Sequence, residues 1–468
     1  MAASMSQGGI CIDEGDTDLP AQFRRAYDDG DTDGIMKLAS SNDRLLFQEH
    51  GTTSVVVELI QASIDAADGR NGMAASILNG LLGACVVLAS DDSHDVAAAQ
   101  RAMELIDAWE DMSKEEGIHP DLVSYCLVYS ALHPIMAGTE DGKDYFVDAA
   151  DEMLDKARRL AKKVGGTQYR KANARARRKG GQATSYAKDN IEALQERYGS
   201  DFSILHEDDD VLVVSKPSGM VCYHQRKTTA GKVGRKKRKK GVKQEDAAVD
   251  ADISLVDALV EDANVRMSTL NPKAAGIVHR IDRGTSGCIV LAKADEMHAL
   301  LVAEFFTRGA HKVYDALIPA RPVYVHEADG QVDDTLPDSG AINLPINDKS
   351  ARSKFEVVKR FDEDEAIRIR METFTGRKHQ VRRHAAEGLS RPLFLDAMYW
   401  KSNSKNLATV TMEDHLPDAI ARLCAESSRK DDKERFFLHA ASLRIPKLGI
   451  VVEAPLPSWW RDVEKELS

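Results

Sequence analysis

Residues 279–293 read His-Arg-Ile-Asp-Arg-Gly-Thr-Ser-Gly-Cys-Ile-Val-Leu-Ala-Lys, and this stretch decides what kind of domain the chain contains. It places one carboxylate, Asp282, between Arg280 and Arg283, and then turns through two glycines into an apolar run of strand length. Cationic neighbours favour the ionised form of a carboxyl group, so we expect Asp282 to be available as a nucleophile or a base. The alternative is a surface ion pair beside a turn, which is the commoner role of a lone Asp.

Four further segments accompany this stretch in a fixed order. Upstream, residues 204–220 end in Ser-Lys-Pro-Ser-Gly-Met. Downstream, residues 311–317 read His-Lys-Val-Tyr-Asp-Ala-Leu and residues 375–382 read Thr-Gly-Arg-Lys-His-Gln-Val-Arg. The last segment combines Phe-Leu-His-Ala at 437–440 with Ala-Pro-Leu-Pro at 454–457. The whole set resembles, in the same order, the motifs of the RluA-type pseudouridine synthases.

This resemblance implies a pseudouridine synthase catalytic domain over residues 201–465. The expected fold class is α+β, with a mixed and mainly antiparallel sheet. The residue pattern agrees, because it predicts strands and helices that do not alternate strictly. We expect strands at 211–215, 288–292, 312–318, 355–359 and 366–373, and helices at 295–308 and 379–387.

The resemblance also implies roles for five side chains. Asp282 takes the place of the catalytic carboxylate. Tyr314 matches the tyrosine that stacks on the target base, and Arg382 matches the arginine that compensates the carboxylate charge in a pocket that excludes water. Arg280 and Arg377 are expected to hold the surrounding phosphates. Whether Asp282 attacks the sugar or acts mainly as a base stays open.

The function that follows is an RNA pseudouridine synthase, which isomerises specific uridines in rRNA or tRNA. The reaction includes no redox step and no phosphoryl transfer, so we expect no cofactor, and the sequence shows no metal-binding motif. A uridine inside a stem cannot reach such a pocket, so the target lies in a loop or is flipped out. The alternative function is a catalytically inactive helical-repeat adaptor that binds RNA.

Two positions depart from the family pattern. Ser215 stands where the family usually has Asn before Lys-Pro, and Leu395 stands where it has Gly before the Asp of a late Gly-Asp-x-x-Tyr motif. The second departure predicts an altered backbone near the pocket rim, because glycine is favoured where the chain turns sharply. Lys216 receives no role beyond the turn that it shares with Pro217.

The charge distribution fits an RNA partner better than the net charge does. The chain of 468 residues carries a formal charge of -12. However, residues 156–188 and 226–243 are basic runs without a single acid. Local potential attracts phosphate, so these runs are expected to meet RNA, and the cluster at 235–240 would serve equally well as a nuclear-import signal.

The part before the catalytic domain is expected to be helical. Residues 1–17 form an acidic, disordered tail, residues 18–164 carry apolar residues at helical spacing, and residues 165–200 are a basic linker with a short helix. Residues 117–125 resemble the junction of pentatricopeptide repeats, so this all-α, helical-repeat-like domain would choose the RNA or contact a protein partner. Residues 225–251 are expected to be a basic insertion in the catalytic domain.

Location is only weakly constrained by the sequence. We find no uninterrupted apolar stretch of membrane-spanning length and expect no membrane association. The first residues are acidic, which favours cytoplasm or nucleus, and an organelle remains open if the start is mis-assigned. The six cysteines are scattered, which indicates neither a zinc site nor a disulfide framework.

Overall fold

The computed structural model describes most of the catalytic region and four long helices before it. The described residues are 60–61, 63–64, 71–90, 96–138, 143–166, 186–224, 254–323, 335–361, 365–400, 412, 416–426 and 435–468. The acidic tail, most of the basic linker and the basic insertion lie outside the described residues.

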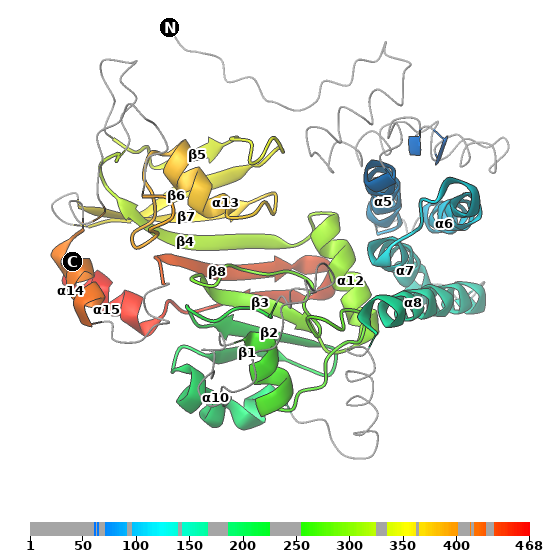
Figure 1. Ribbon diagram of the computed structural model, residues 1–468, viewed down its shortest axis with the longest axis horizontal. Coiled ribbons are helices and arrows are strands. Elements are labelled where there is room, and N and C mark those ends of the chain that lie inside the picture. The colour runs from blue at the N-terminus through cyan, green and yellow to red at the C-terminus, as the bar shows by residue number, and fades with distance from the viewer. Residues whose placement is uncertain are drawn as a thin grey trace, which may run out of the picture.

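A nine-stranded sheet forms the centre of the molecule (Figure 1). Its strands are β1 (Ser203–Glu207), β2 (Val211–Lys216), β3 (Ser286–Ala292), β4 (His311–Pro319), β5 (Ser339–Ile342), β6 (Ser353–Arg360), β7 (Ala366–Thr373), β8 (Leu438–Ile445) and β9 (Ile450–Glu453). The order is β1-β2-β3-β8-β4-β7-β6-β5, with β9 paired to β8. Only β3 and β8 run parallel, so the sheet is mixed and mainly antiparallel, as the α+β class requires.

Each expected strand lies within an observed one, and the side-chain pattern explains why. All seven residues of β3 are buried, as a continuous apolar run predicts for a central strand. Strand β7 alternates instead, with Ile367, Ile369 and Met371 buried on one face and Arg368 and Arg370 on the other. The strands β1, β5, β8 and β9 were not among those expected from the residue pattern.

Gly287 allows the parallel strands β3 and β8 to approach each other. Its φ of 103° lies in a region that favours glycine, and an added Cβ would lie 2.3 Å from the carbonyl oxygen of Ala440. Pairing begins at Ser286 with His439 and at Gly287 with Ala440. The second glycine of the 279–293 stretch therefore anchors the Asp282 loop to the sheet.

Helices and short helical turns surround this sheet at its ends and on its faces. The helices are α5 (Asn71–Ala89), α6 (Val96–Glu116), α7 (Leu122–Gly138), α8 (Lys143–Gly165), α10 (Ile191–Tyr198), α11 (Leu255–Asp257), α12 (Asp295–Phe306), α13 (Gln380–Arg383), α14 (Asp418–Glu426) and α15 (Ser458–Glu466). Short 3-10 or π segments are η1 (Ala187–Asn190), η2 (Ala258–Asp262), η5 (His384–Gly388) and η8 (Pro446–Leu448).

The helix expected at 379–387 differs from a single α-helix. The α-helical part is confined to α13, and the chain continues as the π segment η5. His384 begins that segment fully buried, with ring contacts of 2.9 Å to the Ser353 hydroxyl and 3.0 Å to the Leu344 carbonyl. These two contacts to neighbouring elements account for the change of helical winding, which is common beside functional sites.

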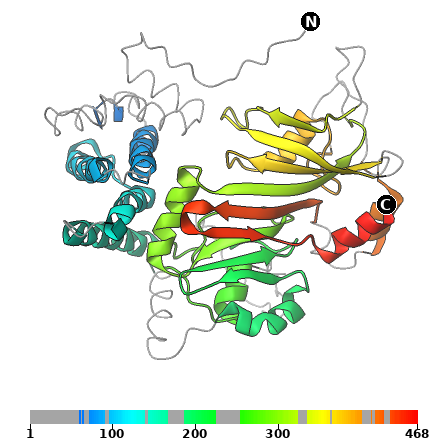
Figure 2. The ribbon, with the colours of Figure 1, turned by 180° about the vertical axis from the view of Figure 1, so that it is seen from behind.

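The helices α5 to α8 pack against one another and against α12 (Figures 1 and 2). Leu270, Ala299, Leu300 and Ala303 of the sheet-bearing part belong to the same apolar core as the buried side chains of these helices. Arg158 of α8 adds ion pairs of 2.8 Å to Asp295 and 3.0 Å to Glu296. If the two parts were separated, each would therefore expose apolar surface to water.

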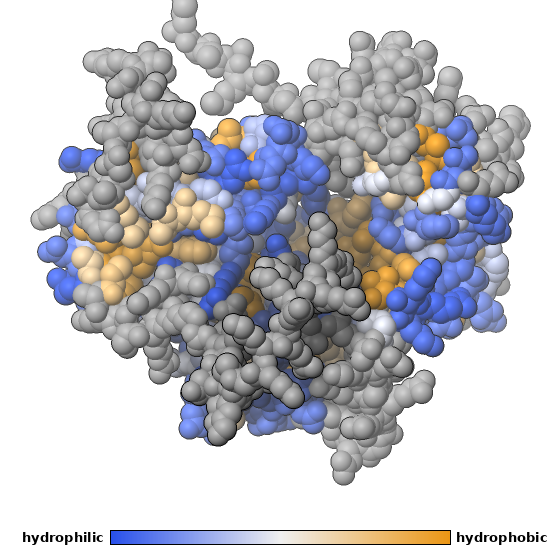
Figure 3. All heavy atoms as spheres, viewed as in Figure 1, coloured by the Kyte–Doolittle hydropathy of each residue, from blue (hydrophilic) through white to orange (hydrophobic). Residues whose placement is uncertain are grey.

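The outward surface of this helical part agrees with that packing. Figure 3 shows mostly hydrophilic side chains over the outer sides of α6 and α8, with apolar side chains gathered towards the sheet. The turn at residues 117–121 contains Asp121, which receives a backbone bond from Ser124 and a side-chain bond from Asn79 of α5. The resemblance of this turn to a pentatricopeptide junction stays a prediction.

Helix α5 corrects the expectation that no segment is long and apolar enough to cross a membrane. Over Gly72–Ala89 the mean hydropathy is 1.9, which satisfies that test by length and composition. Small residues interrupt the apolar run, which is why it does not stand out in the sequence. However, 72% of this window is buried inside the protein, and core helices pass the same test, so one such helix is weak evidence.

The shared core predicts that a substitution on α12 destabilises the whole assembly. Leu300→Ala is expected to lower the free energy of unfolding by about 2 to 4 kcal/mol, because it leaves a cavity between α12 and the helices before it. Denaturant unfolding followed by circular dichroism measures this change. Val451→Ala, at a side chain that is 65% exposed, serves as the control and should change it by less than about 0.5 kcal/mol. Equal effects of both substitutions would argue against a shared core.

Candidate active site

A cavity of about 280 Å³ lies where the loop before β3 meets the end of α12, strand β4 and the start of α13. It is lined by Val278, His279, Arg280, Ile281, Asp282, Thr285, Phe305, Arg308, Lys312, Tyr314, Thr373, Thr375, Gly376, Arg377, His379, Gln380, Val381, Arg382 and Leu438. All five side chains that the sequence nominates line this cavity. They come from three segments that lie far apart in the chain.

Asp282 sits on the loop before β3 with its side chain 30% exposed. Its Oδ2 accepts a hydrogen bond of 3.1 Å from Nη1 of Arg382. Its Oδ1 lies 3.7 Å from Nε2 of His379. One oxygen is thus held by a guanidinium, while the carboxylate as a whole still faces the cavity.

Arg382 is held on its other side by Asp396. Its Nε and Nη2 each donate a hydrogen bond of 2.7 Å to the two Asp396 oxygens, and this pair is buried, with side chains 7% and 1% exposed. Its guanidinium also lies over the rings of Tyr399 and Phe436. Burial opposes the charge of Arg382, but the bonds and charges of Asp396 and Asp282 outweigh burial and raise its pKa.

Tyr314 lies on β4 and faces the same cavity. In the sheet it is paired with Met371 of β7 and Ala440 of β8, and the pairing with β8 shifts register just before it. Burial raises the pKa of Tyr314, and the charge of Asp282 adds to the effect. The phenol therefore keeps its proton at neutral pH.

The Thr-Gly-Arg turn is fixed by Gln380. The side-chain oxygen of Gln380 accepts bonds from the hydroxyl of Thr375 at 2.7 Å and from the backbone N–H of Arg377 at 3.0 Å. Arg377 also donates from Nε to the carbonyl of Ser350 at 2.9 Å. Arg280, by contrast, lies exposed at the cavity.

His379 is a site residue for which no catalytic role was predicted. It has a left-handed φ of 57°, a strained conformation for a histidine that recurs at functional sites. Its Nδ1 lies 2.9 Å from the hydroxyl of Tyr399. Burial lowers the pKa of His379 although the Asp282 charge opposes this, so the ring is neutral at pH 7. Its place in the Thr-Gly-Arg-x-His-Gln-Val-Arg segment was the available signal.

The Lys-Pro-Ser-Gly turn clasps the loop that carries Asp282. The ammonium group of Lys216 donates to the carbonyls of Pro217 at 2.9 Å, Met220 at 2.8 Å and Arg283 at 3.2 Å. The hydroxyl of Ser218 donates a hydrogen bond of 2.7 Å to the carbonyl of Gly284. Lys216 thus has a structural place beyond its own turn, because it joins the two segments.

Leu395 adopts a left-handed φ of 67° immediately before Asp396. This is a conformation in which glycine is favoured, so the family's glycine and this leucine are compatible with the same backbone. The leucine packs against two of the apolar cores. The expected change of backbone at the pocket rim is thus not required. Leu395 in place of glycine instead adds backbone strain on the order of 1 kcal/mol.

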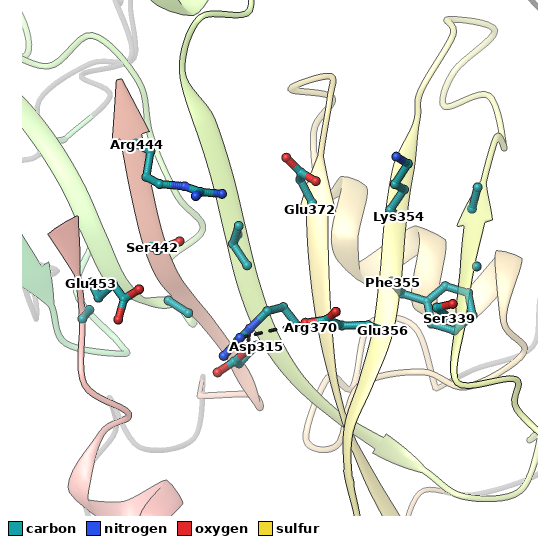
Figure 4. A pocket seen from close by; sticks show the side chains of 15 residues that line it. Asp315, Ser339, Lys354, Phe355, Glu356, Arg370, Glu372, Ser442, Arg444 and Glu453 are labelled. Atoms are coloured by element: carbon teal, nitrogen blue, oxygen red, sulfur yellow. Dashed lines mark hydrogen bonds and ion pairs between the residues drawn. The ribbon is translucent and has the colours of Figure 1, made fainter. Parts of the chain in front are cut away.

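A second and larger cavity, of about 750 Å³, lies on the opposite face of the sheet (Figure 4). Val313 and Asp315 line it, whereas Tyr314 between them lines the first cavity, as alternation along a strand requires. Acids and bases are interspersed there, and Arg370 pairs with Asp315 at 3.0 Å. None of the five nominated residues lines this second cavity.

Comparisons with known proteins agree with this geometry. The family model described as RNA pseudouridylate synthase matches residues 210–387, which include the Asp282 loop, β4 and α13. An uncharacterized RNA pseudouridine synthase of Zymomonas mobilis is 32% identical over 197 residues, covering 40% of this chain and 75% of that protein. The chain belongs to the RNA pseudouridine synthase family. Members of this family are isomerases that act on RNA.

Other relatives of the family share less of their length or sequence. The ribosomal large subunit pseudouridine synthase D of Pseudomonas aeruginosa is 26% identical over 57% of this chain and 74% of its own. The chloroplastic RNA pseudouridine synthase 2 of Oryza sativa is 27% identical over 56% of this chain and 64% of its own. Alignments with other relatives cover as little as 51% of the relative. The structure of human RNA pseudouridylate synthase domain containing 4 is 19% identical, with a TM-score of 0.39, over 60% of this chain and 96% of that one.

The buried pair in this family site predicts a large loss of stability when Asp396 is neutralised. Asp396→Asn should lower the free energy of unfolding by about 3 kcal/mol, because Arg382 keeps a buried charge with less compensation. Urea unfolding measures the change. The neighbouring pair of Arg383 with Glu387 is equally close, at 2.8 Å, but more exposed, so Glu387→Gln should change it by less than about 1 kcal/mol. Similar small losses in both variants would contradict the structural role of Asp396.

The clasp made by Lys216 predicts a specific pH dependence. Burial lowers the pKa of Lys216 to about 8, so the folded state binds fewer protons than the unfolded state between pH 8 and 10.5. The contribution of this residue to stability therefore rises with pH across that window. Relative to a Lys216→Met variant, the wild type should gain stability from pH 7.5 to pH 10 in urea melts. If the difference in unfolding free energy between the two proteins stays constant over this range, burial does not lower the pKa of Lys216.

Proposed function

We propose that this protein converts uridine to pseudouridine in RNA and that Asp282 is the catalytic carboxylate. The observation that carries the proposal is the ion pair of Asp282 with Arg382, set in a cavity that Tyr314 also lines. A carboxylate that is paired with a guanidinium, partly exposed and set in a cavity that an aromatic ring also lines has the features that the reaction needs.

The isomerisation moves the glycosidic bond from N1 to C5 of uracil. The bond from C1′ to N1 breaks, the base rotates, and a bond from C1′ to C5 forms, while the proton that leaves C5 is balanced by one gained at N1. A carboxylate at the sugar assists either by attacking C1′ or by accepting a proton. Arg382 stabilises the negative charge of Asp282 in both versions. No redox change occurs, so the chain's own residues suffice for the proposed steps.

Tyr314 is proposed to stack on the target base. The cavity volume of about 280 Å³ is at the lower end of small-molecule pockets, so it admits one nucleotide and no duplex. The target uridine therefore leaves its stack before it enters. The neutral His379 beside Asp282 is a second group that can exchange a proton with the base.

The proposed substrate is ribosomal RNA, with transfer RNA as the alternative. The name of the Pseudomonas relative refers to the large ribosomal subunit, which supports this choice. Arg280 and Arg377 at the cavity are proposed to hold phosphates of that RNA. The pentatricopeptide-like reading of the helices α5 to α8 would give them a part in choosing the RNA. A protein partner at the same helices is the other possibility for them.

Replacing Asp282 tests the proposal directly. We expect Asp282→Asn to lower pseudouridine formation by about 10³-fold or more, because the amide can neither attack the sugar nor accept its proton. RNA binding should persist. The measurement incubates purified protein with total RNA from cells that lack the gene and maps pseudouridine by sequencing.

Asp462→Asn serves as the matched control, since that side chain is exposed and forms an ion pair of 2.9 Å with Lys465, which is exposed as well. Its activity should equal that of the wild type. Undiminished product with Asp282→Asn would defeat the catalytic assignment. Binding of RNA without product in the wild type would instead favour an inactive adaptor.

A further inference from the structure

The cavity that holds Asp282 carries more positive charge than the ion pair requires. Among the described residues, its lining has five permanent or usual cations and one acid. The cations are Arg280, Arg308, Lys312, Arg377 and Arg382, and the acid is Asp282. Asp282 and Asp396 together compensate Arg382. The remaining charge makes this cavity attractive to an anion.

Lys312 combines partial burial with a lack of charged partners among the described residues, whereas Arg280 lies exposed to water. It lies on β4, partly buried, and within the described parts of the chain no hydrogen bond or ion pair reaches its ammonium group. Burial lowers the pKa of Lys312 to about 8, and the charge of Arg308 adds to the effect. A cation in such a position is unfavourable unless an anionic ligand compensates it.

The surroundings of Lys312 leave room for such a ligand. Its Nζ lies 5.9 Å from the centre of the Phe305 ring, which stacks on His279. A Cβ added to Gly376 would lie 3.9 Å from that Nζ, so the ammonium reaches across to the Thr-Gly-Arg turn.

Arg308 lines the same cavity. It is held in a left-handed φ of 67° in the turn between α12 and β4, and its Nη1 donates to the carbonyl of Phe305 at 3.3 Å. Strained backbone of this kind tends to persist where it positions a ligand group. Two cations from one turn and strand thus face the same space.

The spacing along β4 relates this space to the base. Lys312 and Tyr314 are two residues apart and lie on one face, which places them about 7 Å apart along the strand. This separation is short enough for one nucleotide to place its base on Tyr314 and a backbone phosphate at Lys312. Asp282 lines the same cavity.

We propose that Lys312, together with Arg308, forms a phosphate subsite that binds the RNA backbone next to the flipped uridine. The inference rests on the proposed function, since it takes an RNA nucleotide as the ligand. The subsite reads no base, and it positions the nucleotide so that its sugar reaches Asp282. Lys312 is a binding residue in this scheme and takes no part in the bond changes.

The first experiment measures RNA binding without using the reaction. A short uridine oligonucleotide is titrated with wild type, Lys312→Met and Lys312→Arg at several salt concentrations. Lys312→Met should weaken binding about tenfold and reduce the slope of log affinity against log salt by about 0.7, because one single-strand phosphate contact is lost. Lys312→Arg should restore both. An unchanged slope with Lys312→Met would overturn the proposal.

Two readouts separate binding from a structural role. Wild-type affinity should fall above about pH 8, where Lys312 loses its proton, whereas Lys312→Arg should hold its affinity there. Lys354→Met is the matched control, because Lys354 lies on the opposite face of the same sheet, and it should leave slope and affinity unchanged. Equal effects of Lys312→Met and Lys354→Met would overturn the subsite.

The second experiment locates the phosphate. Once the target uridine has been mapped, RNAs are made with an uncharged methylphosphonate linkage on its 5′ or its 3′ side. One of these should raise KM for the wild type about tenfold and change KM for Lys312→Met far less, with kcat nearly unchanged. If each methylphosphonate linkage raised KM by the same factor in the wild type and in Lys312→Met, the subsite would be contradicted even though the wild type forms pseudouridine. If the wild type forms no pseudouridine, the proposed function fails. The slope of log affinity against log salt in the first experiment still tests the subsite in that case.

Discussion

The candidate site depends on one buried chain of charges, from Asp396 through Arg382 to Asp282. A guanidinium taken out of water is costly unless carboxylates replace its hydration, and Asp396 supplies two short bonds that do so. Those bonds use Nε and Nη2, which leaves Nη1 for Asp282. Asp282 can therefore remain partly exposed while its charge is compensated from behind. A reactive carboxylate needs that combination of fixed partner and open face.

The rest of the fold holds the ends of this chain in place. Asp282 sits on a loop that Lys216 ties to the Lys-Pro-Ser-Gly turn, and Gly287 joins that loop to β8. Arg382 lies in the short helix α13, and Gln380 at the start of that helix closes the turn before it. Helix α12, which supports the helices before the catalytic region, ends at Phe306 beside the cavity-lining Phe305. Helix α12 thus connects the packing of the preceding helices to the wall of the cavity.

The sequence predicted the parts of the fold that rest on local pattern. The continuous apolar run of β3 and the alternation of β7 were visible, because burial on both faces or on one leaves a direct trace in residue order. Strand β9 has only four residues and gave no such trace. The winding change after α13 also escaped prediction, since it depends on bonds of His384 to other elements. Helix α5 was underestimated because small residues break up its apolar run.

By itself the sequence determined which chemistry-bearing residues the chain has, because ordered motifs tie Asp282, Tyr314 and Arg382 to their family positions. The sequence also contains Asp396, the Asp of the late Gly-Asp-x-x-Tyr motif, but it does not indicate which side chain Asp396 binds. Only the tertiary structure decided that Asp396 fixes Arg382, that His379 faces Asp282, and that Lys312 lines the same cavity without an ion pair to any residue that the structure describes. The reason is physical: compensation of charge is set by distance and burial in space, and neither follows from the order of residues along the chain.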